Sequence, residues 1–164
     1  MEGYFRLQTK DKKIFKVTKK AAVLSELLKG MKGIPDSYDI PLNDDISSQT
    51  IEKIINYLNH FDGNPPKEIS KPLYMTDMKK ITDEYSADFA DKLTVEELVD
   101  LISAAHYLKI DSLLDLCCAK MVALCKGKNE EDIFKLFGIP KDYFKPEDKE
   151  KIKENNKWID EVFQ

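Results

Sequence analysis

The residues best suited to chemistry in this sequence are three cysteines and two histidines. Cys117, Cys118 and Cys125 lie in one apolar stretch, whereas His60 and His106 lie in other segments. The spacing argues against a zinc site, because Cys117 and Cys118 would point about 100° apart on a helix, whereas zinc ligands converge from CxxC loops. We expect the cysteines to be small buried hydrophobes, and we expect no metal and no cofactor.

Other catalytic signatures are missing from the sequence. It contains no phosphate-binding glycine loop, no HExxH motif and no GxSxG motif. The acidic residues at 96–97 and 130–132 resemble first turns of helices, where carboxylates meet the positive end of the helix dipole. We therefore predict a protein without catalytic residues. An enzyme with a cysteine or histidine nucleophile is the minor alternative, and it requires exposed cysteines.

Composition and charge exclude several classes of protein. The net charge is −4, from 26 basic and 30 acidic residues, whereas a nucleic-acid-binding domain needs a positive field to meet phosphates. The opening MEGYFRLQTKDKK has no apolar core of a signal peptide. An odd number of cysteines confined to one segment is unlike a secreted disulfide framework. We expect reduced thiols, a location in the cytoplasm and nucleus, and no nucleic acid as partner.

The segment that holds the cysteines poses a packing problem. From Leu113 to Cys125 only Asp115 and Lys120 are charged, so a helix here is apolar almost all round. Such a helix is either buried on every side or spans a membrane. A span needs about twenty apolar residues, so this segment is too short and we expect no membrane contact. Asp111 or Ser112 is the expected N-cap.

The first sixty residues predict a small α+β unit. Apolar residues alternate in residues 4–17 around a polar turn at 10–12, which is typical of a β-hairpin. A short amphipathic helix is predicted over residues 21–31, and prolines limit 34–42 to an edge strand or loop. Residues 47–61 predict a helix with Ser47 or Ser48 as N-cap. One face of that helix is apolar: Ile51, Ile54, Ile55, Leu58 and Phe61.

The rest of the chain is predicted to be a polar loop followed by helices. Residues 62–80 contain glycine, three prolines and mixed charge without any period, which is typical of a mobile loop. Residues 94–110 predict a helix with an apolar arc wider than half its circumference, and Tyr107 lies on the remaining polar face. Asn129 is the expected N-cap of a short helix, and Pro146 the first residue of a last one. Between Pro146 and Lys157 only Ile152 is apolar, so the last helix is marginal without a partner.

Residues 101–139 resemble the corresponding stretch of the S-phase kinase-associated protein family, the adaptors of SCF ubiquitin ligases. The family pattern is roughly L-I-x-A-A-N-Y-L-x-I-x-x-L-L-D, then K-G-K-[TS]-x-E-E-I and F-x-I. This chain has LISAAHYLKIDSLLD, KGKNEEDI and FGI at those places. The segments IFKV, IPLNDDISSQTIEKIINYLNH and KENNKW resemble further family motifs, so the resemblance covers essentially the whole chain.

The resemblance implies an α+β fold of the BTB/POZ type, a small sheet with helices, in residues 1–125, with the mobile loop at 62–80. Residues 126–164 would add two helices of the SKP dimerisation type, which complete an F-box-binding groove. Elongin C shares the BTB part but lacks these helices. The implied function is a non-enzymatic adaptor that links a cullin to F-box substrate receptors, for ubiquitin-dependent protein degradation.

The resemblance also implies two partner surfaces, carried over residue by residue. The F-box-binding set is Leu98, Val99, Ile102, Leu113, Leu116, Cys117, Met121, Val122, Ile133, Phe137, Ile139 and Trp158. The cullin-binding set is His106, Tyr107, Ile54 and Leu58. On this interpretation the apolar segment is covered by its own core on one side and by F-box helices on the other. Whether the free chain forms a homodimer stays open.

Departures from the family pattern leave two alternatives open. His106 stands where the family has Asn, which bears on cullin affinity because the imidazole ring is larger than the amide. A cullin-independent F-box-binding scaffold, in a kinetochore or trafficking complex, is therefore the second hypothesis.

Some protist members resemble this chain in having a proline near the start of the last helix, and there it is hydroxylated and glycosylated. For Pro146 the resemblance implies hydroxylation, whereas the residues alone indicate a plain first-turn proline.

Overall fold

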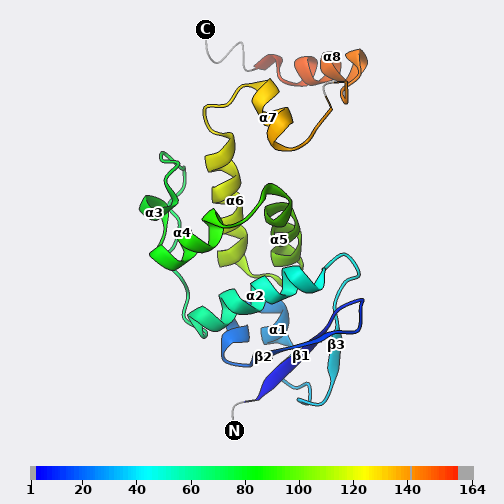
Figure 1. Ribbon diagram of the computed structural model, residues 1–164, viewed down its shortest axis with the longest axis vertical. Coiled ribbons are helices and arrows are strands. Elements are labelled where there is room, and N and C mark those ends of the chain that lie inside the picture. Colours follow the sequence, from blue (N-terminus) through cyan, green and yellow to red (C-terminus); the bar gives the residue numbers. More distant parts are fainter. Residues whose placement is uncertain (1–2, 141, 159–164) are drawn as a thin grey trace. The chain divides into compact units, whose positions relative to one another are not determined.

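The computed structural model describes residues 3–140 and 142–158 (Figure 1). The chain divides into two compact units, Met1–Lys126 and Gly127–Gln164. Among the described residues the first unit holds a three-stranded sheet and helices, and the second holds helices alone. The predicted α+β class is therefore confirmed.

The sheet is built around the first strand. Strand β1 (Tyr4–Gln8) pairs antiparallel with β2 (Ile14–Thr18), which confirms the predicted hairpin. On its other edge β1 pairs parallel with β3 (Asp39–Pro41), a three-residue edge strand. Apolar side chains of all three strands turn to one face of the sheet and enter the core: Phe5, Leu7, Val17 and Ile40.

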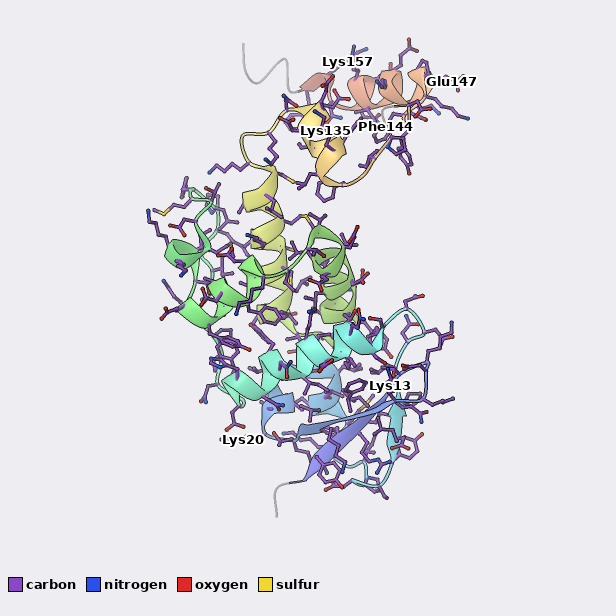
Figure 2. The ribbon with its side chains drawn as sticks, viewed as in Figure 1. Lys13, Lys20, Lys135, Phe144, Glu147 and Lys157 are labelled. Carbon is purple, nitrogen blue, oxygen red and sulfur yellow. The ribbon has the colours of Figure 1, made fainter. Side chains whose placement is uncertain are left out.

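The hairpin turn is tied to the helix that follows the sheet. Lys12 adopts a left-handed conformation with φ of 64°, which a residue other than glycine seldom does. The hydroxyl of Ser48 donates to the carboxylate of Asp11, whose two oxygens lie 2.7 and 2.9 Å from it. Hydrogen bonds from Thr9 and Ser48 lower the pKa of Asp11 well below its usual value. The turn thus packs on the first residue of helix α2. The ammonium group of Lys13, labelled in Figure 2, lies 3.1 Å from the carboxylate of Asp11.

Helix α2 (Ser48–Phe61) lies across the centre of the first unit (Figure 1). Ser47 is its N-cap and accepts a hydrogen bond from the backbone of Thr50 at 3.1 Å, as predicted. Helix α5 (Val95–Leu108) begins with a capping box between Thr94 and Glu97. Helix α6 (Asp111–Cys125) packs against α5, and α2 packs against both α5 and β2. The apolar faces of these three helices and the sheet form one core.

The cap predicted for α6 is wrong. Its N-cap is Ile110, which provides no side-chain hydrogen bond, and Asp111 is already helical. The hydroxyl of Ser112 instead receives a hydrogen bond from the buried Tyr57 hydroxyl at 3.3 Å. At the other end the prediction is confirmed, because Gly127 follows the last turn with φ of 77°.

A short segment joins the sheet to the helices. It contains a 3-10 turn, η1 (Ala21–Leu24), and helix α1 (Glu26–Gly30), joined by Ser25. The fully buried hydroxyl of Ser25 donates to the carbonyl of Leu108 at 2.5 Å and accepts from the backbone N–H of Leu28 at 3.2 Å. The backbone N–H of Glu26 donates to the carbonyl of Lys109 at 3.0 Å. Ser25 is therefore both the cap of α1 and the link to the end of α5.

Replacing Ser25 with alanine should lower the free energy of unfolding by about 2 kcal/mol, because it removes a helix cap and leaves a buried carbonyl without its donor. Urea unfolding followed by circular dichroism measures this change. The exposed Ser37 is the matched control, and Ser37→Ala should change stability by less than about 0.5 kcal/mol. Equal effects of the two substitutions would contradict the assigned role.

Two helices between α2 and α5 were not predicted. They are α3 (Met78–Ile81) and α4 (Glu84–Asp91), each with an aspartate cap, Asp77 and Asp83. Part of the segment expected to be a loop also reaches the core, since Ile69 and Met78 are buried. The apolar residues of 62–80 are too far apart to form a period, so the sequence pattern did not indicate their burial.

The second unit contains two described helices with little core. They are α7 (Glu130–Leu136), capped by Asn129 as predicted, and α8 (Pro146–Asn155), which begins at Pro146 as predicted. The ring of Phe134 lies 5.9 Å from that of Phe144, which also contacts Tyr143. No residue of either helix is buried. Figure 2 labels Phe144 before α8, Glu147 in its first turn and Lys157 beyond its end.

Candidate protein-binding surfaces

Helix α6 is covered by its own core over its first half only. Leu113, Leu116, Cys117 and Ala119 are buried, whereas Met121, Ala123 and Leu124 are half-buried. Val122 is 47% exposed. Near its end the helix has a shallow hollow of about 310 Å³ lined by Met121, Val122, Cys125 and Lys126. We call these four residues the α6 hollow.

Helix α5 has an apolar residue outside the core as well. Val99 is 47% exposed and Ile102 is half-buried, although the sequence pattern placed both on the core arc with Leu98. The arc was wider than the core that α5 faces. Exposed valines on α5 and α6 indicate apolar surface that remains for a partner.

Four members of the predicted F-box-binding set lie in the core. Leu98, Leu113 and Cys117 are completely buried, and Leu116 is 1% exposed. A partner cannot touch these side chains in this structure, so we assign them to the layer beneath the surface. Val99, Ile102, Met121 and Val122 remain as the accessible members within the first unit.

The second unit holds the other four members of that set. Ile133, Phe137 and Ile139 are half-buried, and Trp158 is 57% exposed. Ile152, the single apolar residue of α8, is 47% exposed. A unit with two helices, no buried helical residue and an exposed tryptophan has apolar surface that its own chain does not cover.

Hydrogen exchange of the free protein should show almost no protection in α8. The helix has 10 residues and no buried side chain, and an isolated helix of this length is marginal in water. By contrast, amides of α2, which lies in the core, should exchange many orders of magnitude more slowly. Strong protection of residues 149–155 in the monomer would show that α8 is stable without a partner.

The predicted cullin-binding residues divide into two pairs. At the end of α5, His106 is exposed and Tyr107 is 39% exposed, so both are accessible. Ile54 and Leu58 are fully buried, however, and belong to the core. The exposed residues of α2 are others: Gln49, Glu52, Asn56, Asn59 and His60. A helical wheel would have found these five, because they lie opposite Ile54 and Leu58.

The cysteines do not share one environment. Cys117 is buried, and burial raises the pKa of its thiol to about 12. Cys118 is exposed and Cys125 is partly exposed, so the prediction of buried hydrophobes is right for Cys117 alone. Among the residues that the structure describes, no cluster of three or more His, Cys, Asp or Glu side chains could hold a metal ion. In the same part of the chain, no helix has the length and hydropathy to cross a membrane.

Comparison with known proteins gives matches to both ends of the chain. Residues 4–62 match the tetramerisation domain of the Skp1 family, and residues 111–159 match the dimerisation domain of that family. The S-phase kinase-associated protein 1 homolog of Tetrahymena thermophila is 38% identical over 160 residues, covering 96% of this chain and 94% of the relative.

Two further relatives extend the comparison. The SCF ubiquitin ligase complex protein SKP1a of Dictyostelium discoideum is 35% identical over 162 residues, covering 95% of each chain. The Skp1-related protein of Caenorhabditis elegans is 28% identical over 170 residues, covering 98% of this chain and 93% of the relative. The two family matches leave residues 63–110 between them. That interval holds α3, α4, α5 and the preceding loop.

Proposed function

Because the chain belongs to the Skp1 family, we propose that it is the non-enzymatic adaptor subunit of an SCF-type E3 ubiquitin ligase. The resemblance found in the sequence is confirmed, and so is its BTB/POZ-type fold, through the match of residues 4–62. Two Dictyostelium relatives are named SCF ubiquitin ligase complex proteins. Their names support the adaptor role over a scaffold outside ubiquitin ligases.

The observation that carries the proposal is the exposed apolar surface of the α5–α6 pair. Val99 and Val122 are each 47% exposed beside the half-buried Ile102 and Met121. A soluble chain that keeps branched aliphatic side chains in water on neighbouring helices has a surface suited to an amphipathic helix of a partner. We propose that the F-box motif of a substrate receptor supplies this helix, and that residues of the second unit bind the same partner.

The second interaction of the adaptor, cullin binding, is proposed for the end of α5. His106 and Tyr107 are exposed there, and they offer a ring nitrogen and a phenolic hydroxyl for directional hydrogen bonds. They lie seven and eight residues after Val99, about two turns further along α5. The adaptor would thus hold two partners through separate residues, and the substrate would come close to the ubiquitin-transferring enzymes bound to the cullin.

Reconstitution tests the proposal directly. The purified chain is mixed with a recombinant F-box domain and a cullin N-terminal domain, and the mixture is separated by size-exclusion chromatography with light scattering. We expect a 1:1:1 complex. Wild-type chain that binds no F-box domain, alone or in affinity purification from its native lysate, would refute the proposal. The same chromatography of the free chain shows whether it forms a homodimer.

Location is a separate proposal. We propose that the protein works in the cytoplasm and nucleus with its three cysteines reduced, since Cys117, Cys118 and Cys125 are all free thiols. Microscopy of a fluorescently tagged chain at its native expression level tests this. A secretory pattern would refute it.

Trp158→Ala should weaken binding of an F-box domain by about 2 kcal/mol, roughly 30-fold, because exposed tryptophans often become anchors in interfaces. Its 57% exposure means that the free energy of unfolding should change little. Tyr143, 66% exposed in the same unit, is the matched aromatic control. Calorimetric titration measures both variants. A lower melting temperature with unchanged affinity would show that Trp158 stabilises the fold and does not contact the F-box domain.

A further inference from the structure

The loop between α2 and α3 is fastened to α6 by two lysines. The ammonium group of Lys71 lies 2.8 Å from a carboxylate oxygen of Asp115 in α6. From the end of α6, the ammonium group of Lys126 donates to the carbonyls of Tyr74 at 2.7 Å and Leu73 at 3.2 Å. These contacts bridge 44 to 53 residues of sequence. In Figure 1 the loop accordingly lies beside α6.

At and just after the second of these anchors the loop holds apolar side chains in water. Tyr74 is 80% exposed and Met75 is 53% exposed, while Leu73 packs against the core. The loop borders a hollow of about 160 Å³ lined by Lys67, Ser70, Pro72, Leu73, Tyr74, Met75, Lys80 and Ile81. The backbone of Tyr74 is fixed by Lys126, so part of the cost of ordering this segment is met before a partner binds, which favours binding.

This surface is linked to the α6 hollow through one residue. Lys126 binds the carbonyls of Leu73 and Tyr74 and also lines the hollow with Met121, Val122 and Cys125. Lys126 therefore holds the backbone of Tyr74, the residue before Met75, beside the α6 hollow. Both apolar areas lie within the first unit.

We infer that residues 71–75 form a second wall of the F-box-binding surface, with Tyr74 and Met75 as partner contacts and Lys71 and Lys126 as positioning residues. The inference rests on the proposed function and names a part of the same site. It deepens that function by assigning partner selectivity to a segment outside both family matches, which cover residues 4–62 and 111–159.

The charges around the wall indicate the chemistry of the partner. Lys67 and Lys80 line the 160 Å³ hollow. Lys80 forms an ion pair with Asp77 at 3.8 Å, whereas Lys67 forms none with any residue that the structure describes. No acidic residue lines that hollow. The matching partner segment carries a large apolar side chain, which packs on Tyr74 and Met75, flanked by aspartate or glutamate. F-box proteins with an acidic segment beside the motif should bind more tightly than those with a basic one.

Substitution of the exposed pair tests the contact role. The double variant Y74A/M75A in the full chain should weaken binding of a recombinant F-box domain at least tenfold in calorimetric titration. Tyr38, 56% exposed in the loop before β3, is the matched control, and Tyr38→Ala should change Kd less than twofold. Unchanged affinity of Y74A/M75A, with wild-type binding intact, overturns the wall and leaves the proposed function standing. Failure of the wild type to bind overturns both.

A charge exchange tests the positioning role of Lys71. Lys71→Glu places two carboxylates together, so it should speed hydrogen exchange of the amides of residues 73–75 and raise Kd severalfold. Adding Asp115→Lys restores a pair of opposite charges, so it should return both the exchange rates and the Kd toward their wild-type values. If Lys71→Glu acted only by destabilising the fold, the second substitution would not restore the Kd. No change in exchange or affinity in Lys71→Glu overturns the assignment, and so does selective loss of cullin binding in either loop variant.

Discussion

Val122→Asp should reduce binding of an F-box domain at least a hundredfold, about 3 kcal/mol or more. Val122 is 47% exposed in the free chain and lies in the α6 hollow, so a carboxylate is tolerated there before binding. On association with an apolar helix the same carboxylate loses much of its water, and this desolvation cost appears only in the complex. Titration calorimetry with wild type and variant measures the difference.

The control for this substitution is Val23→Asp. Val23 is 41% exposed in η1, so it matches Val122 in residue type and exposure. It should leave F-box affinity within twofold of the wild type, and both variants should keep the wild-type circular dichroism spectrum. If Val23→Asp weakens binding as much as Val122→Asp, the effect is general and the α6 surface is not the site.

Tyr107→Ala should abolish cullin binding and preserve F-box binding. The side chain is 39% exposed on the polar face of α5, so its removal costs little stability. Tyrosine anchors at the centre of an interface contribute about 2 kcal/mol or more, which is a large share of the affinity of a small contact. Because Tyr107 and the Val99–Ile102 surface share no contacts in this proposal, their substitutions should be additive. Chromatography of the three-component mixture reports both interactions at once.

His106 decides how this result is interpreted. If wild-type chain binds no cullin of its own organism, His106→Asn should recover binding, since it returns the amide that the family pattern has at this position. Tyr107→Phe separates the hydroxyl from the ring, because it keeps the apolar contact and removes one donor. Cullin binding that persists in Tyr107→Ala would place the cullin elsewhere on the chain.

Much of the fold could be predicted from local patterns. The hairpin, α2 with its Ser47 cap, α7 with its Asn129 cap and the start of α8 at Pro146 all follow from period and capping chemistry that lie within a few residues. The parallel pairing of β1 with β3 brings together residues 33 apart, such as Arg6 and Asp39, and no local pattern encodes it. Helices α3 and α4 are short, and their aspartate caps were the signal available in the sequence.

The surfaces were harder to predict than the elements. An arc wider than half of α5 was assigned to the core as a whole, so Val99 and Leu98, about 100° apart on the helix, received the same assignment although one is exposed and the other buried. The family resemblance likewise led to the assignment of Ile54 and Leu58 to a partner surface. A motif match aligns residue positions but gives no information on whether a side chain is exposed. The anchoring of residues 71–75 by Lys126 joins distant parts of the chain and left no trace in the pattern.

The junction at Ser25 bears on how the chain is made. Its hydroxyl bonds to a carbonyl 83 residues later, and the neighbouring amide of Glu26 bonds to Lys109. When only the hairpin, α1 and α2 have left the ribosome, Ser25 and Glu26 therefore still lack their partners, Leu108 and Lys109. Such a fragment should remain loosely folded and exposed to proteases until α5 emerges and docks. Expressed as two separate polypeptides, residues 1–69 and 70–164 should each fail to fold alone and should regain structure when mixed.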